Sequence, residues 1–415
     1  MIDLKELRKN PDFFVEAAKN KNVQLDIKTI LAADEEVLAL KKQIDGINAK
    51  RNIIAKQGKE GVEEGKVLKE KLKELEPQLA DKEKSLNDLL LNIPNPARPD
   101  VKIGKNEDEN EEIRVVGKIP KFAFPAKDYM DLGEALDIID VKRASKVSGS
   151  RFGYIKGDAA LLEFAIVQYV LNILTKEGFC PVVPPVFIKT SSMQAMGYLQ
   201  HGGLDEVYAF DKDDLVLVGT AEQSIGPYHM DEVLEEKQLP LRYVGFSTCF
   251  RREAGSYGKD TRGILRVHQF DKLEMFSFCH PDKSDAEHEY LVSLEEKILQ
   301  GLKLPYHVLK MCTGDLGDVS ARRYDIETWL PSEQRYRETH SCSQVWDFQS
   351  RRLNIKYKDG QSGKNEYVHL LNGTAAAIGR LIIMIIENYQ QADGSINIPE
   401  VLQPWMMDKK TIVKK

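Results

Sequence analysis

Four arginines lie close together in residues 250–276, which read FRREAGSYGKDTRGILRVHQFDKLEMF. They are Arg251, Arg252, Arg262 and Arg266, and apolar stretches flank the loop that carries them. A planar guanidinium group can bind two phosphate oxygens at once, so an arginine-rich strand–loop–strand can hold a triphosphate or an RNA backbone. The alternative for this segment is a solvated hairpin whose charges pair with one another.

The sequence lacks the common short motifs for phosphate binding and metalloprotease chemistry. It contains no GxxxxGK[ST] loop, no GxGxxG after a strand and no HExxH helix. A protein with this sequence that uses ATP must therefore hold the phosphates in another way.

Two further charged residues stand where structure alone does not favour them. Glu274 lies in the apolar run LEMFSF, where a carboxylate without a partner is costly, and a substrate ammonium or hydroxyl would supply that partner. Arg380 falls near the start of an expected helix, although cations are favoured at helix C-termini. Both positions favour a functional role.

Residues 115–415 alternate between β-branched runs and helical patterns without a regular βαβ rhythm. We expect strands at residues 215–220, 242–251 and 272–279, and helices at residues 160–176, 284–300 and 375–389. Runs of strands beside separate helices are typical of an α+β domain with an antiparallel sheet. Residues 93–114, rich in proline and charge, are expected to be a linker.

The N-terminal region carries the strongest periodic pattern, between about residues 33 and 93. Apolar residues recur at alternating three- and four-residue steps in two limbs, joined by a turn at residues 56–61. These positions are Val37, Leu40, Ile44, Ile47 and Ile54 in the first limb, and Leu68, Leu72, Leu75, Leu79, Leu86, Leu89 and Ile93 in the second. This spacing predicts an antiparallel helical coiled coil, and Pro77 in the second limb is expected to kink it.

Composition bounds the class of protein. The chain has 415 residues, 42% of them hydrophobic, and a formal net charge of −6, so any nucleic-acid binding must come from a local basic surface. No run of about 18 apolar residues or secretion signal is evident, and we expect a cytoplasmic protein that does not associate with a membrane. Five scattered cysteines without a CxxC pair argue against a disulfide framework and a cysteine-based zinc site.

Several segments together resemble the class II aminoacyl-tRNA synthetases, in the form found in seryl-tRNA synthetases. Residues 242–278 resemble motif 2 of that class, residues 368–390 with NGTAAAIGR resemble motif 3, and residues 160–187 with GFCPVVPPVF resemble motif 1. Thr220-Ala221-Glu222 matches the serine-binding loop. The resemblance implies an α+β fold: a class II antiparallel-sheet catalytic domain at residues 101–415, preceded by a tRNA-binding coiled-coil domain at residues 1–100.

The resemblance also implies roles for individual residues in binding ATP. Arg251 and Arg380, with Glu338, are expected to be catalytic: Arg251 binds the α-phosphate, and Arg266 and Arg380 bind the outer phosphates. Glu253 accepts from the adenine amino group, Phe270 stacks on the ring, and Val267 lines the pocket. The full expected ATP set is Arg251, Arg252, Glu253, Arg266, Val267, Phe270, Glu338, Thr339, His340, Ser341 and Arg380.

For the amino acid and the metal ion, the implied residues are fewer. Serine is expected to contact Thr220, Ala221, Glu222, Glu274 and Thr374, and Mg²⁺ is expected at Glu338 and Ser341. One departure concerns this region: where the family usually has Glu-Ile-Ser-Ser, this chain has Glu338-Thr339-His340-Ser341, which retains both ends.

The resemblance implies an ATP-dependent, homodimeric serine–tRNA ligase of protein biosynthesis that charges tRNA(Ser) and also tRNA(Sec). A basic face of the arm is expected to contact the tRNA, with candidates Lys41, Lys42, Lys50, Arg51, Lys56, Lys59, Lys66, Lys69, Lys71 and Lys73. Two alternatives stay open: a paralogue that ligates an amino acid to a carrier protein, and a catalytically silent tRNA-binding relative.

Overall fold

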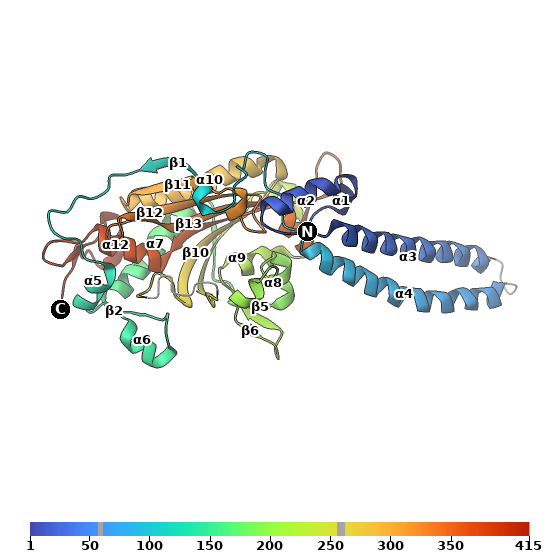
Figure 1. Cartoon of the computed structure of the whole chain (residues 1–415), viewed down its shortest axis with the longest axis horizontal. Coiled ribbons are helices and arrows are strands. Elements are labelled where there is room, and N and C mark those ends of the chain that lie inside the picture. Colours follow the sequence, from blue (N-terminus) through green and yellow to red (C-terminus); the bar gives the residue numbers. More distant parts are fainter. Residues whose placement is uncertain (57–60, 255–261, 415) are drawn as a thin grey trace. The chain divides into compact units, whose positions relative to one another are not determined.

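The computed structural model describes residues 1–56, 61–254 and 262–414, and the chain separates into two compact units, Met1–Pro96 and Ala97–Lys415. The first unit is helical. It contains two short helices, α1 (Leu4–Lys9) and α2 (Pro11–Asn20), followed by the long pair α3 (Ile27–Ile54) and α4 (Val62–Leu91), which lie side by side in Figure 1.

The long helix pair confirms the predicted coiled coil. Val37, Ile44 and Ile54 of α3 are buried, as are Leu68 and Leu72 of α4, because the three- and four-residue steps place them along one seam. At 1.5 Å per residue, the 28 residues of α3 extend roughly 42 Å.

Polar contacts at the edges of this seam join the two helices as well. The ion pairs Lys41–Glu83 (2.7 Å) and Lys82–Glu36 (2.5 Å) link α3 to α4. Pro77 lies inside α4, which continues as one helix on both sides of it. A proline there leaves one carbonyl of the preceding turn without its helical donor, and the seam packing is sufficient to keep the helix in phase.

The second unit is built on an eight-stranded sheet with the order β1-β11-β12-β13-β16-β10-β9-β4, in which only the β4–β9 pair is parallel. This confirms the α+β class with an antiparallel sheet. Its strands are β1 (Glu111–Val116), β4 (Cys180–Val182), β9 (Leu241–Phe250), β10 (Gln269–Cys279), β11 (Tyr306–Lys310), β12 (Arg322–Leu330), β13 (Arg335–Trp346) and β16 (His369–Ala377).

Small sheets and helices complete this unit. The remaining strands are β2 (Ile139–Asp140), β3 (Tyr154–Ile155), β5 (Phe187–Lys189), β6 (Ala209–Phe210), β7 (Leu215–Leu217), β8 (Val233–Glu235), β14 (Lys356–Lys358), β15 (Asn365–Tyr367), β17 (Ile396–Asn397) and β18 (Thr411–Ile412). The helices are α5 (Tyr129–Ala135), α6 (Val141–Ser148), α7 (Asp158–Lys176), α8 (Thr190–Met196), α9 (Glu222–Ile225), α10 (Ser284–Gly301), α11 (Phe348–Leu353) and α12 (Ile378–Asn388).

The two faces of the large sheet differ because side chains alternate along each strand. Helices α7, α10 and α12 pack on one face, over the core that contains Leu273 and Met275 of β10 (Figure 1). On the same strand Lys272 and Glu274 line cavities. The sheet thus separates an apolar, helix-covered side from a polar side.

Three sequence expectations differ from the structure. Residues 375–377 belong to strand β16 rather than to the following helix, which starts at Ile378, since their alanines pair with β10. Residues 111–114 belong to β1, because pairing with β11 makes an edge strand of this charged segment. Among the described residues, helix α7 is long and apolar enough to cross a membrane by length and composition alone. About half of this helix is buried inside the structure, as in the core helix of a folded domain.

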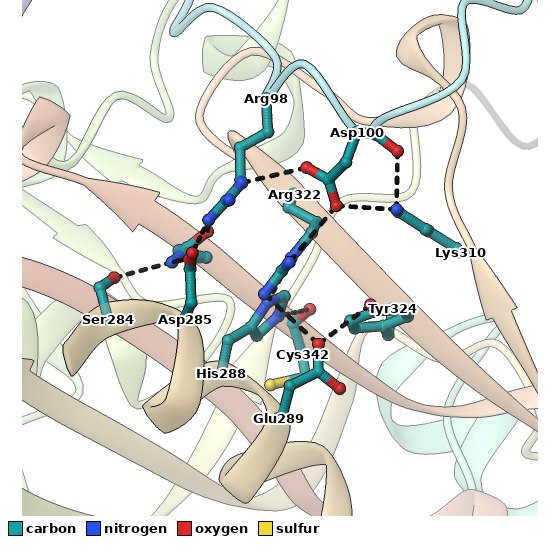
Figure 2. A network of polar contacts seen from close by, with 11 residues as sticks. Arg98, Asp100, Ser284, Asp285, His288, Glu289, Lys310, Arg322, Tyr324 and Cys342 are labelled. Atoms are coloured by element: carbon teal, nitrogen blue, oxygen red, sulfur yellow. Dashed lines mark hydrogen bonds and ion pairs between the residues drawn. The ribbon is translucent and has the colours of Figure 1, made fainter. Parts of the chain in front are cut away.

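A buried polar network fixes part of the sheet behind the polar side (Figure 2). Arg322 of β12 donates from Nε to Nδ1 of His288 (3.0 Å), and Nε2 of His288 donates to the carbonyl of Cys342 (3.0 Å). Burial, reinforced by Arg322, lowers the pKa of His288 to about 3, so the ring is neutral. Asp100 accepts a hydrogen bond from Nζ of Lys310 (2.8 Å) and forms an ion pair with Arg322 (3.4 Å). The network thus contacts β13 at Cys342, the residue after Ser341.

Candidate functional site

Two adjoining cavities open on the polar side of the large sheet and share the residues between them. The first, the nucleotide cavity, is lined by Arg251, Glu253, Ile264, Leu265, Arg266, Val267, Phe270, Lys272, Glu338, Thr339, Thr374, Ala377, Gly379 and Arg380. The second, the carboxyl pocket, includes Thr220, Glu222, Glu274, Arg323, Ser341, Asn372 and Thr374, and again Arg251, Glu253, Arg266, Lys272 and Glu338. The shared residues make the two hollows one continuous site.

Arginines from three elements meet at the nucleotide cavity. Arg251 directly follows β9, its Nε donates to the carbonyl of Gly219 (3.3 Å), and its guanidinium lies 5.3 Å from the ring centre of Phe270. Arg266 pairs with Glu253 at 2.9 Å. Arg380, in the first turn of α12, donates to the carbonyl of Glu338 at 2.8 Å. The cavity therefore combines an aromatic ring with a concentration of positive charge.

Glu338 is the acidic counterpart of these arginines. Its side chain is 45% exposed; partial burial tends to raise its pKa, but the guanidinium groups of Arg380, Arg323 and Arg251 outweigh this and lower the pKa to about 2. Its carboxylate lies 3.4 Å from Arg380. The group is ionised at neutral pH, and its charge offsets part of the surrounding positive charge.

The carboxyl pocket places two acidic side chains beside hydroxyl groups. Thr220 donates from Oγ1 to Oε2 of Glu274 at 3.1 Å, and Lys272 forms an ion pair with the same oxygen. Tyr198 donates to Oε1 of Glu222 at 2.7 Å. Glu222 and Glu274 are 4% and 2% exposed, so their charges depend on these few partners.

The protonation of Glu222 is poised near neutrality. Burial, reinforced by the nearby charge of Glu274, raises its pKa to about 7, while the hydrogen bond from Tyr198 opposes the rise. A cation entering the pocket favours the ionised form. The pocket suits a small molecule with an ammonium and a hydroxyl group, next to a cavity that suits phosphates.

Most residues expected from the sequence line these cavities, but three do not. Arg252 is exposed and its guanidinium lies 5.9 Å from the ring centre of Tyr208, and Ala221 is completely buried. His340 is also completely buried, and its Nδ1 lies 2.9 Å from the hydroxyl of Thr339. Arg262, counted with the loop arginines, pairs with acidic residues of the α5 region at 2.6 Å and lines neither cavity.

Other cavity residues were missed at the sequence level. Lys272 could have been found, because it stands two residues before Glu274 and a strand places both on one face. Tyr198 and Arg323 of the carboxyl pocket carry no local signal, and neither does Gln349, which lines neither cavity but donates to Glu222 at 3.4 Å. They come from segments far apart in the chain, and only the fold brings them together.

Comparison with known proteins agrees with this geometry. Residues 207–389 match the family model of the tRNA synthetase class II core domain (G, H, P, S and T), and residues 1–97 match the seryl-tRNA synthetase N-terminal domain. The chain is 44% identical to the serine–tRNA ligase of Dictyoglomus turgidum over 98% of both chains, and 42% identical to that of Deinococcus radiodurans over 99% of both.

Solved structures show the same relationship. The seryl-tRNA synthetase of Pyrococcus horikoshii, in complex with ATP, superposes with a TM-score of 0.92 at 36% identity, with all of both chains covered. The cytoplasmic serine–tRNA ligase of Naegleria fowleri, in complex with AMP, gives a TM-score of 0.86 at 33% identity and covers 98% of this chain and 96% of that one.

The antiparallel sheet with arginines on its polar face defines a class II aminoacyl-tRNA synthetase catalytic core. Within that class, the N-terminal helical unit and the full-length relatives are decisive. The chain belongs to the seryl-tRNA synthetase family and has ATP-dependent serine–tRNA ligase activity.

Proposed function

We propose that the two cavities divide the activation reaction between them, with ATP held by the arginines and L-serine held beside Glu274. The observation that carries this division is the position of Arg251, which lines both cavities. The relative from Pyrococcus horikoshii is in complex with ATP, which supports a nucleotide at the corresponding surface.

The arginines answer the main physical difficulty of adenylation. The serine carboxylate, an anion, must attack the α-phosphate of a polyanion, and both must be held close together. Arg251 is proposed to hold the α-phosphate as its charge grows, while Arg266 and Arg380 hold the outer phosphates. Glu253, Val267 and Phe270 are proposed to bind adenine. The attack releases pyrophosphate and forms seryl-adenylate without a covalent enzyme intermediate. The 3′-terminal hydroxyl of the tRNA then attacks the seryl carbonyl carbon, and AMP leaves.

The residues expected to bind Mg²⁺ offer suitable donors. Glu338 supplies an ionised carboxylate and Ser341 a hydroxyl, both at the carboxyl pocket, and Mg²⁺ prefers oxygen ligands. When bound there, the ion would supply positive charge that offsets the charge of the phosphates. The other expected nucleotide residues in this strand, Thr339 and His340, and also Arg252, stay predictions, as does Ala221 for serine.

Serine selection follows from size and hydrogen bonding. Thr220, Glu222, Glu274 and Thr374 are proposed to surround the amino acid. Threonine carries one more methyl group and is excluded by space, while alanine lacks the hydroxyl and leaves buried polar groups unpaired. The unpaired polar groups can lower kcat/KM for alanine relative to serine by a factor of up to about 10⁴.

The raised pKa of Glu222 leads to a pH prediction. Below its pKa of about 7 the carboxyl is neutral, and above it a negative charge appears beside the serine ammonium. We expect the KM for serine to fall by roughly three- to ten-fold from about pH 6 to about pH 8. Serine-dependent ATP–pyrophosphate exchange measures this, and the KM for ATP serves as the internal control.

Two variants sharpen the test. In Glu222→Gln the KM for serine should no longer fall with rising pH. In Tyr198→Phe the fall in KM should occur at higher pH, because the hydroxyl group that favours the ionised form of Glu222 is lost. An unchanged pH profile in Glu222→Gln would exclude this carboxyl as the titrating group.

For the tRNA, we propose that the N-terminal domain, residues 1–100, binds tRNA(Ser) through the basic face of the arm. At the described end of the helix pair, Arg51, Lys66 and Lys69 line a groove together with Asn48 and Asn52. Lys59 lies outside the described residues. Recognition of shape and phosphate suits RNA, whose deep groove hides the base edges. A tRNA(Sec) with a similar arm would be charged in the same way.

We further propose a cytoplasmic homodimer without membrane association. Exposed apolar side chains at α7 and the segment after it support a subunit interface: Phe164 is 64%, Val183 82% and Phe187 49% exposed. The cysteines are free thiols, which fits a reducing compartment, and one relative is described as a cytoplasmic enzyme.

Pyrophosphate exchange and tRNA charging test the proposal directly. We expect exchange with serine and not with alanine or threonine, followed by charging of tRNA(Ser) and tRNA(Sec) transcripts. Exchange without charging of any tRNA, but with transfer to a carrier protein, would favour the carrier-protein ligase. No exchange with any amino acid would favour the silent tRNA-binding relative.

A further inference from the structure

Lys272 is a buried lysine between the two cavities, and the proposed reaction does not use it. Lys272 is 7% exposed, and it lines both the nucleotide cavity and the carboxyl pocket. Its Nζ forms an ion pair with Oε2 of Glu274, two residues along β10. A buried ammonium is expensive unless it has a charged partner, so this pair is a specific arrangement.

Three buried carboxyl groups lie around this single ammonium. Glu274 is in contact with it, Glu222 stands across the pocket, and Glu295 of α10 lies behind the sheet, where neither of its carboxyl oxygens has a hydrogen-bond partner. Burial, reinforced by Glu274, raises the pKa of Glu222 to about 7 and that of Glu295 well above its usual range. Of the three, Glu274 is the carboxyl group in direct contact with the Lys272 ammonium.

The geometry also orients that carboxylate. Lys272 and Thr220 both contact Oε2 of Glu274, with Thr220 at 3.1 Å. Glu274 pairs with Thr374 of β16 on one side and Gly245 of β9 on the other, so its backbone is fixed within the sheet. With one oxygen held twice, Oε1 is left for the amino acid.

We propose that Lys272 is a positioning residue for serine specificity, which acts by holding the carboxyl group of Glu274 beside its ammonium group and oriented toward the amino acid. The proposal rests on the proposed assignment of Glu274 to serine. A lysine with only a structural role would support the fold and affect both substrates alike. A positioning role predicts a selective loss of serine binding that depends on Glu274.

Other charged and titratable groups act on the pair from the surrounding elements. They are Tyr198 and Glu222 from the pocket wall, Cys249 from the end of β9, His340 and Cys342 from β13, and Glu295 from α10. Arg251 and Glu338 line the same two cavities. Because several of these groups also titrate, the KM for serine of each variant is compared with that of the unmodified protein at the same pH.

The test is serine- and ATP-dependent pyrophosphate exchange by full-length variants. Lys272→Met keeps the approximate length of the side chain but removes the charge and the ion pair with Glu274. We expect the KM for serine to rise by about 10- to 100-fold near pH 6.5, and the KM for ATP to change by less than about three-fold.

A double-mutant cycle identifies the route of the effect. Glu274→Gln alone should raise the KM for serine at least as much, and Lys272→Met in that background should add little, because the lysine acts through the carboxylate. Lys272→Arg keeps the charge and should retain a KM for serine within about five-fold of the unmodified value. Thermal unfolding of each variant shows whether it is folded, and Lys272→Arg keeps the test open should Lys272→Met fail to fold.

Several outcomes would overturn the role of Lys272. They are equal changes in both KM values, additive effects in the cycle, or a Lys272→Arg variant that binds serine as poorly as a Glu274→Gln variant. An unchanged KM for serine in Glu274→Gln would overturn it too, and would also remove Glu274 from the serine site. Failure of the proposed function looks different, because the unmodified protein would then show no serine-dependent exchange.

Discussion

Replacement of Arg251 by glutamine is expected to lower kcat/KM for serine-dependent pyrophosphate exchange by about 10³-fold. Arg251 lines both cavities, its backbone N–H donates to the carbonyl of His268 (3.0 Å), and its guanidinium lies near Phe270. It is therefore held where a carboxylate and a phosphate would meet. Loss of a preorganised charge at that point removes stabilisation that the transition state needs most.

Two controls accompany this variant. Arg251→Lys keeps the charge but lacks the planar guanidinium group, so its kcat/KM for pyrophosphate exchange should still fall by more than about ten-fold. Arg262→Gln is the matched control, because Arg262 comes from the same arginine-rich segment but pairs with Asp128 and Asp131 outside both cavities. We expect the Arg262→Gln substitution to change kcat/KM for pyrophosphate exchange by less than about three-fold. Comparable losses in the Arg262 and Arg251 variants would contradict the proposed site.

Removal of the end of the arm should separate the two half-reactions. A variant in which residues 48–67 are replaced by a short glycine linker is expected to keep pyrophosphate exchange within about two-fold, because the catalytic unit, Ala97–Lys415, contains every residue of the two cavities. Charging of tRNA(Ser) should fall by about 10²-fold or more in kcat/KM, since phosphate contacts supply much of the affinity for RNA.

A milder variant checks that charge is responsible. Lys66, Lys69 and Lys73 are exposed residues of α4, and their joint replacement by alanine should weaken charging and reduce its dependence on salt. Glu63 and Glu70, which pair with two of these lysines, provide the opposite substitution: alanine there should not weaken charging. Equal loss of exchange and charging after the deletion would refute the proposed division of labour.

The sequence was sufficient to predict features that depend on local periodicity. The seam of α3 and α4 could be identified because apolar spacing of three and four residues specifies which face of a helix is buried, whatever it packs against. Pro77 shows the limit of this reasoning, because its local helix-breaking tendency did not interrupt α4. The extension of β16 through Ala377 has a similar cause, since alanine favours helix locally and pairing with β10 overrides it.

The functional site also has features that the sequence predicts and features that depend on the fold. Short motifs were enough to identify Arg251, Glu274 and Arg380 as chemically unusual residues, because residue type and near neighbours alone make a charge improbable in an apolar strand or at a helix start. Only the tertiary structure decided which charges meet. The pKa of Glu222 near 7 and the arginines around Glu338 arise from segments that are distant in sequence or from burial. Lys272 and Glu274 are near neighbours on β10, but the fold alone buries their ion pair between the two cavities. Coulomb energy and desolvation depend on distance and solvent in three dimensions, and neither is determined by the order of residues along the chain.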